Sequence, residues 1–230
     1  MIDDWFSYRV ADFVPFTAEV YFRLIERVGE TFWPMHLLTV AMGLATLILV
    51  LRGRGRIACL LLAVVWGWVG ITFMMQRYAQ LNWAGEYFGW GFLMQAALLA
   101  LIAWIGHGLT GSGRPRGVPG WTALALTVVG LVLYPFIAPL AGYDGFQAET
   151  FGIHPDPTAV ATLGIVLLAL DGGWRWLAIL IPVFWCLISA LTLQVLDAPW
   201  AMLLHAIAVL AATTMIWKLI ADVVRARKLN

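Results

Sequence analysis

Seven stretches of this sequence are apolar and long enough to cross a lipid bilayer as helices, and this pattern restricts the fold more than any other feature. A spanning helix needs about 20 predominantly apolar residues. We therefore predict an all-α, polytopic transmembrane bundle at 33–221. Hydropathy, turn signals and charges place its spans at 33–51, 57–76, 87–106, 120–140, 158–174, 176–194 and 199–221.

Composition agrees with a membrane location. Apolar residues make up 62% of the 230 residues and charged residues only 12%, more apolar surface than a soluble core of this size needs. The formal net charge of +1 gives no indication of nucleic-acid binding. We expect Cys59 and Cys186, both inside predicted spans, to be buried as small apolar residues. The lipid bilayer is the expected partner, and membrane-protein subunits are candidate further partners.

The connections between spans differ in charge and predict an orientation. Lys and Arg are retained in the cytoplasm, so the basic connections lie inside. This places the N-terminus outside and the basic tail 222–230 inside, in the cytoplasm. Eleven of the 13 acidic residues fall on the opposite side. The basic side holds Arg52, Arg54, Arg56, Arg114, Arg116, Arg175, Lys218, Arg225, Arg227 and Lys228.

Residues 1–32 precede the first predicted span and form an external N-terminal segment. The opening Met-Ile-Asp-Asp lacks the basic region of a signal peptide, so we expect this segment to be retained. Within it, apolar residues at helical spacing predict an amphipathic interfacial helix over 17–30, capped by Thr17. Its apolar face contains Val20, Tyr21, Leu24, Ile25 and Val28, and a shorter piece ahead of it contains Trp5, Phe6, Val10 and Phe13.

Two short motifs are distinctive. One is the run 15–22, Pro-Phe-Thr-Ala-Glu-Val-Tyr-Phe, followed by Trp33-Pro34; the other is the run 151–158, Phe-Gly-Ile-His-Pro-Asp-Pro-Thr, at the end of the long outer connection 142–157. With these motifs the chain resembles DUF6064, a family of bacterial integral membrane proteins of unknown function. The family pattern often has Cys where this chain has Asp156, which weakens any idea of a thiol site. The resemblance implies a multi-pass protein of the bacterial cytoplasmic (inner) membrane, and it implies no activity or cofactor.

Histidines provide the one candidate metal site. His36 and His205 each lie near the outer start of a predicted span, at comparable depth, and His154 and Asp156 lie in the outer connection. Three imidazoles and a carboxylate could bind a divalent metal, or two of the imidazoles could ligate a haem. The alternative is that each histidine hydrogen-bonds neighbouring backbone, because no His-x-x-x-His spacing occurs.

Three function classes remain. An accessory or scaffold subunit of a membrane assembly is favoured, because no nucleophile and base are brought together in the sequence. The second class is an outward-facing metal or haem binding protein. The third is a small-solute transporter with 3+1+3 spans, although no carboxylate is expected at mid-membrane. A retinal protein is excluded because Lys218 lies near the end of its span, where it should snorkel to the cytoplasm.

Overall fold

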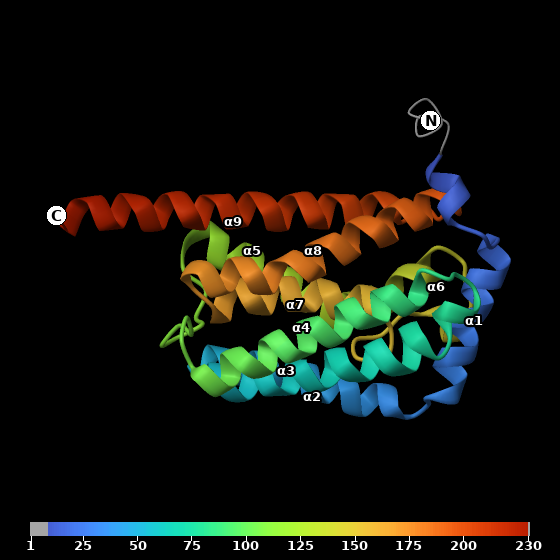
Figure 1. The fold of residues 1–230 in the computed structure, drawn as a ribbon, viewed down its shortest axis with the longest axis horizontal. Helices are drawn as coiled ribbons and strands as arrows, with labels where there is room; N and C mark the ends of the chain where they lie inside the picture. The colour runs from blue at the N-terminus through green and yellow to red at the C-terminus, as the bar shows by residue number, and fades with distance from the viewer. Residues whose placement is uncertain (1–8, 230) are drawn as a thin grey trace.

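A computed structural model describes the backbone of residues 9–229 and the side chains of residues 9–221, and every regular element in this part is a helix. This confirms the predicted all-α fold. Most of the longer helices run along one axis of the molecule (Figure 1). The elements are η2 (Val10–Phe13), α1 (Ala18–Thr31), α2 (Met35–Leu51), α3 (Gly55–Val69), η3 (Gly70–Met75), η4 (Tyr78–Gln80), α4 (Gly85–Ile105), α5 (Gly117–Val128), η5 (Val129–Leu133), η6 (Tyr134–Phe136), α6 (Ile137–Leu140), η7 (Gly145–Gln147), α7 (Pro155–Ala169), α8 (Gly172–Val195) and α9 (Ala201–Leu229).

Length and hydropathy identify the helices that could cross a membrane. In the described residues, five helical segments are long and apolar enough to cross a membrane, and α1 with α2, bent by 88°, would make a sixth. Helix α7 has 15 residues, about 22 Å at the usual rise per residue, so it is shorter than the bilayer core of about 30 Å. The five segments are Gly55–Gln80, Gly85–Ile105, Gly117–Leu140, Gly172–Val195 and Ala201–Ala221.

Helix α1 confirms the predicted helix at 17–30 and corrects its buried face. The Thr17 side chain caps it by accepting a hydrogen bond from the Val20 amide at 3.4 Å. Val20 is 42% exposed, whereas Phe22, which was not predicted to belong to the apolar face, is buried. Figure 1 shows α1 lying across one end of the bundle. A shorter apolar piece was predicted ahead of this helix. Of its residues, Val10 and Phe13 are in η2 and exposed, and Trp5 and Phe6 lie outside the described residues.

One predicted boundary was wrong. The break between spans five and six falls at Leu170 and Asp171 instead of before Trp176, because this dipeptide is extended and pairs with another connection. The Asp171 amide donates to the Gly108 carbonyl at 2.7 Å, which ends α7 early. The last candidate span, Ala201–Ala221, agrees with the predicted span 199–221. Helix α9 itself continues to Leu229, and the side chains of the predicted tail 222–230 lie outside the described part.

Helix α7 forms the centre of the bundle. Every one of its residues is buried, and it contacts α2, α3, α5, η5, α8 and α9. Gly164 allows this close packing, because a Cβ there would lie 2.3 Å from the Ala123 carbonyl oxygen of α5. The short helix is therefore enclosed by protein, and its backbone ends need protein partners.

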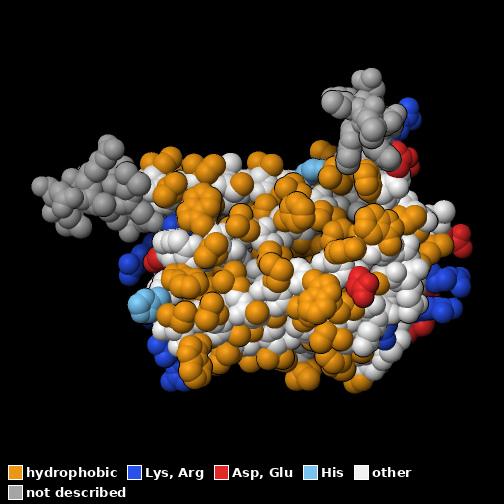
Figure 2. All heavy atoms as spheres, viewed as in Figure 1, with side chains coloured by type: hydrophobic (Ala, Val, Ile, Leu, Met, Phe, Trp, Pro, Cys, Tyr) orange, Lys and Arg blue, Asp and Glu red, His pale blue; other side chains and the backbone are white. Residues whose placement is uncertain are grey.

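The face of the molecule shown in Figure 2 is largely apolar between two charged ends. Trp83, Trp90 and Trp104 are exposed, as expected for residues facing lipid or the interface. Trp66 and Trp185 do not face outward, because both are buried. Their indole N–H groups hydrogen-bond to side chains of α7 instead.

Candidate functional site

Polar side chains gather where the connection after α6 enters α7, beneath α1. We call this group the α7 entry cluster, defined as Glu149, Thr150, His154, Asp156 and Thr158. Glu149, His154, Asp156 and Thr158 are buried. Burial of polar and ionisable groups in an apolar helical bundle is costly unless they are hydrogen-bonded, so the hydrogen bonds of each group decide that cost.

Asp156 forms the densest part of this cluster. The sequence placed it in an outer connection, but α7 begins at Pro155, so Asp156 lies in the first helical turn and is fully buried. Its carboxylate accepts hydrogen bonds from Ser189 Oγ at 2.6 Å, Trp185 Nε1 at 2.8 Å and the Tyr134 hydroxyl at 3.3 Å. The helix N-terminus also favours negative charge here. One carboxylate thus connects α7 to both α8 and η6.

His154 immediately precedes α7, and its hydrogen bond fixes its tautomer. Its Nδ1 accepts from the Thr150 amide at 3.1 Å, so the proton of the neutral ring lies on Nε2. Nε2 forms no hydrogen bond within the described residues. Burial, followed by the neighbouring His36, lowers the pKa of His154 to about 3, and backbone groups of Ile25 and Thr150 oppose part of this. The neutral ring is therefore favoured at this position.

The turn before α7 is held by one hydroxyl. Thr158 Oγ1 donates to the His154 carbonyl at 2.7 Å and accepts from the Gly152 amide at 2.8 Å. Gly152 has a φ of +76°, and a Cβ there would lie 2.7 Å from Cβ of Thr39 on α2. These bonds explain the composition of the motif over 151–158, since only glycine satisfies both the φ and the close approach.

Glu149 carries a buried carboxyl oxygen with no hydrogen bond within the described residues. This oxygen is Oε2. Burial first, and the negative charge of Asp156 second, raise the pKa of Glu149 well above its ordinary value. The neutral, protonated carboxyl is therefore favoured at this position.

The four residues predicted to form a metal site are only partly brought together. The rings of His36 and His154 have centroids 6.4 Å apart. The Asp156 carboxylate is engaged by Tyr134, Trp185 and Ser189, as described above. His205 Nδ1 lies 3.2 Å from the Ala201 carbonyl oxygen, within its own helix. Across the described residues, no group of three or more His, Cys, Asp or Glu side chains could hold a metal ion.

The opposite end of α7 is also closed by side chains. Thr110 Oγ1 donates to the Leu168 carbonyl at 3.0 Å, and Lys218 Nζ donates to the Leu167 carbonyl. The Lys218 ammonium, which was expected to reach toward the cytoplasm, bonds to the end of α7 that lies at the basic end of the bundle. A cation at the last carbonyls of a helix is favoured by their partial negative charge. Both ends of the enclosed helix therefore have protein partners.

Sequence reasoning missed the donors that surround Asp156. Trp185 and Ser189 are four residues apart on α8, so they lie on one face of that helix and can reach the same group. That spacing was available in the sequence, but nothing indicated that Asp156 would be the partner. The Tyr134 hydroxyl comes from the bent segment η6, whose position depends on tertiary packing.

Comparisons with known proteins identify a family but no activity. Residues 18–225 match the model of DUF6064, described as a family of unknown function. No curated protein and no solved structure matches the chain.

Proposed function

Because the chain belongs to DUF6064, a family of unknown function, we propose from its geometry that it is a rigid integral membrane protein acting as an accessory or scaffold subunit of a membrane assembly. One observation supports this most. Asp156 joins three segments through three hydrogen bonds. Lys218 and Thr110 secure the other end of α7. The hydrogen bonds of Asp156, Thr110 and Lys218 thus stabilise the shape of the bundle. The surface is then the part of the protein that would contact other subunits.

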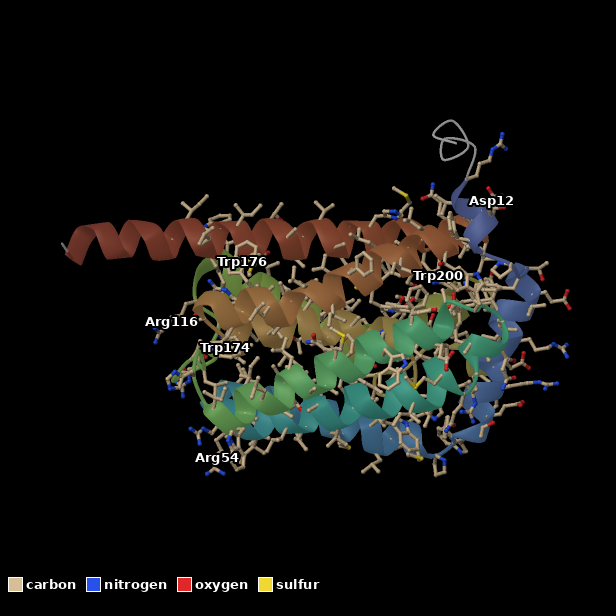
Figure 3. All side chains as sticks on the ribbon, in the orientation of Figure 1. Asp12, Arg54, Arg116, Trp174, Trp176 and Trp200 are labelled. Atoms are coloured by element: carbon tan, nitrogen blue, oxygen red, sulfur yellow. The ribbon has the colours of Figure 1, made fainter. Side chains whose placement is uncertain are left out.

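The proposed topology has seven passes, made by α2, α3 with η3, α4, α5 with η5 to α6, α7, α8 and α9. The enclosed α7 is the fifth pass. Arg54 and Arg116 lie at one end of the bundle and Asp12 at the other (Figure 3). By the positive-inside rule, the Arg54 end would then lie on the cytoplasmic side of a bacterial inner membrane. Helix α1, which lies across the Asp12 end, would rest in the outer interface.

A subunit should touch a defined protein neighbour, and photo-crosslinking in native membranes tests this. A photoreactive amino acid would replace one residue of matched exposure on each of three helices: Trp90 on α4 at 60%, Trp121 on α5 at 62% and Val209 on α9 at 61%. We expect one position to give a protein adduct of a single mass and the others to react with lipid. Val160, buried on α7, is the control and should give no intermolecular adduct. Lipid adducts alone at all three surface positions would refute the proposal.

The other two function classes predict different results in the same preparation. Stoichiometric metal by elemental analysis, or a haem absorption band, would support the outward-facing metal or haem binding protein. Uptake of a small solute into vesicles containing only this chain would support the transporter. The closeness of His36 and His154 is the observation that keeps the metal alternative worth measuring.

A further inference from the structure

A cavity of about 710 Å³ opens at the basic end of the bundle. It lies between residues 110–120, the end of α7, the start of α8 and the C-terminal half of α9. Four basic side chains and one acidic side chain are among the residues that line it, namely Arg114, Arg116, Arg175, Lys218 and Asp171. Their excess of positive charge favours an anionic ligand.

Part of this charge is built into the wall of the cavity. Arg175 is buried, with its guanidinium 3.0 Å from the exposed Asp171 carboxylate. Lys218 is positioned by its bond to the Leu167 carbonyl. Both cations are therefore held by contacts within the fold. Arg114 and Arg116 are exposed, so they can close on a ligand from the connection before α5.

The same cavity has apolar walls that continue onto the lipid-facing surface. Val118 at the start of α5 and Trp217 on α9 line it and are both exposed. A free phosphate has no apolar group to pack against these walls, whereas the acyl chains of a lipid would lie along them. Clusters of basic residues beside membrane helices recognise the headgroups of acidic lipids in this way.

We propose that this cavity binds the phosphate group of an anionic phospholipid, with the headgroup among Arg114, Arg116, Arg175 and Lys218 and the acyl chains along Val118 and Trp217. The cavity lies at the end of the bundle marked by Arg54 and Arg116 (Figure 3). In the orientation proposed above, this lipid would belong to the cytoplasmic leaflet. The lipid site itself does not depend on that orientation.

Native mass spectrometry of the purified full chain tests the site. The protein would be delipidated and titrated with dioleoylphosphatidylglycerol, with dioleoylphosphatidylcholine and with inorganic phosphate in separate series. We expect phosphatidylglycerol to bind with at least about tenfold preference over phosphatidylcholine. The double variant Arg114→Gln, Arg116→Gln should weaken that binding about ten- to thirtyfold, since each basic residue contributes a factor of about three to five.

The matched control is Arg52→Gln, Arg54→Gln. These two arginines are also exposed, also two residues apart and also before a helix at the basic end, but they do not line this cavity. The control should keep the affinity within about twofold of the unmodified chain. Equal loss in both double variants, or no preference for phosphatidylglycerol, would overturn the site. Displacement of the lipid by millimolar phosphate would overturn the lipid assignment. Circular dichroism would show that both variants remain folded.

Discussion

The buried Asp156 accepts hydrogen bonds from α8 and η6, so the loss of one of its donors should weaken the fold. Trp185→Phe removes the 2.8 Å donor and keeps a ring against Phe88 and Phe92. We expect a loss of about 1.5–3 kcal/mol in the free energy of unfolding, the usual contribution of a hydrogen bond to a charged group. Thermal unfolding in detergent, followed with a thiol-reactive dye on the buried Cys59 and Cys186, measures this.

A comparison at Asp156 itself separates hydrogen bonding from packing. Asp156→Asn keeps an acceptor for Trp185, whereas Asp156→Ala leaves buried donors without a partner. The alanine variant should therefore unfold at a clearly lower temperature than the asparagine variant. Equal stability of the two variants and the unmodified chain would mean that the carboxylate does not secure α7.

Glu149 gives a pH dependence with a defined sign. Burial raises its pKa in the folded chain, so the folded state holds a proton that the unfolded state releases above its ordinary value of about 4.3. Its contribution to stability is present at acid pH and is lost as pH rises from that value toward the folded pKa. Glu149→Gln should raise the unfolding temperature at pH 7 by a few degrees and leave it unchanged near pH 4.

The control for Glu149→Gln is Glu19→Gln, which changes an exposed glutamate on α1. It should produce no shift that depends on pH. His154 acts in the opposite direction: its pKa falls to about 3, so its contribution is lost as pH falls from about 6.5 toward 3. A Glu149→Gln variant less stable than the unmodified chain at pH 7 would show that the charged carboxylate has a partner in the fold.

At the scale of elements, the enclosure of α7 depends on close approach at glycine. Gly164→Ala places a Cβ 2.3 Å from the Ala123 carbonyl, so α5 and α7 must separate. Gly67→Ala on α3 is the matched control, because its Cβ would lie 3.8 Å from the Ala96 side chain. We expect about 1–3 kcal/mol of destabilisation for Gly164→Ala and little change for Gly67→Ala. Equal unfolding temperatures for the two variants would contradict this packing.

The sequence predicted the elements better than the contacts between them. Helix α4 was predicted at 87–106 and lies at Gly85–Ile105, because local hydropathy and the flanking turn residues define it. Helix α7 was predicted to end at 174, but a bond from Asp171 to the distant Gly108 carbonyl ends it earlier. The donors to Asp156 escaped prediction for the same physical reason: they come from α8 and η6, which only packing brings together.

At the scale of the whole molecule, the proposed seven passes place the connection 141–154 and the connection 106–116 on opposite sides of the membrane. In a background of Cys59→Ala and Cys186→Ala, the exposed Ala141 and Ser112 would be replaced singly by cysteine. We expect a membrane-impermeant maleimide to label Ala141→Cys in intact cells and Ser112→Cys only after permeabilisation, because positively charged connections stay in the cytoplasm. Labelling of both positions from the same side would refute the proposed passes between them, and the reverse pattern would refute the orientation.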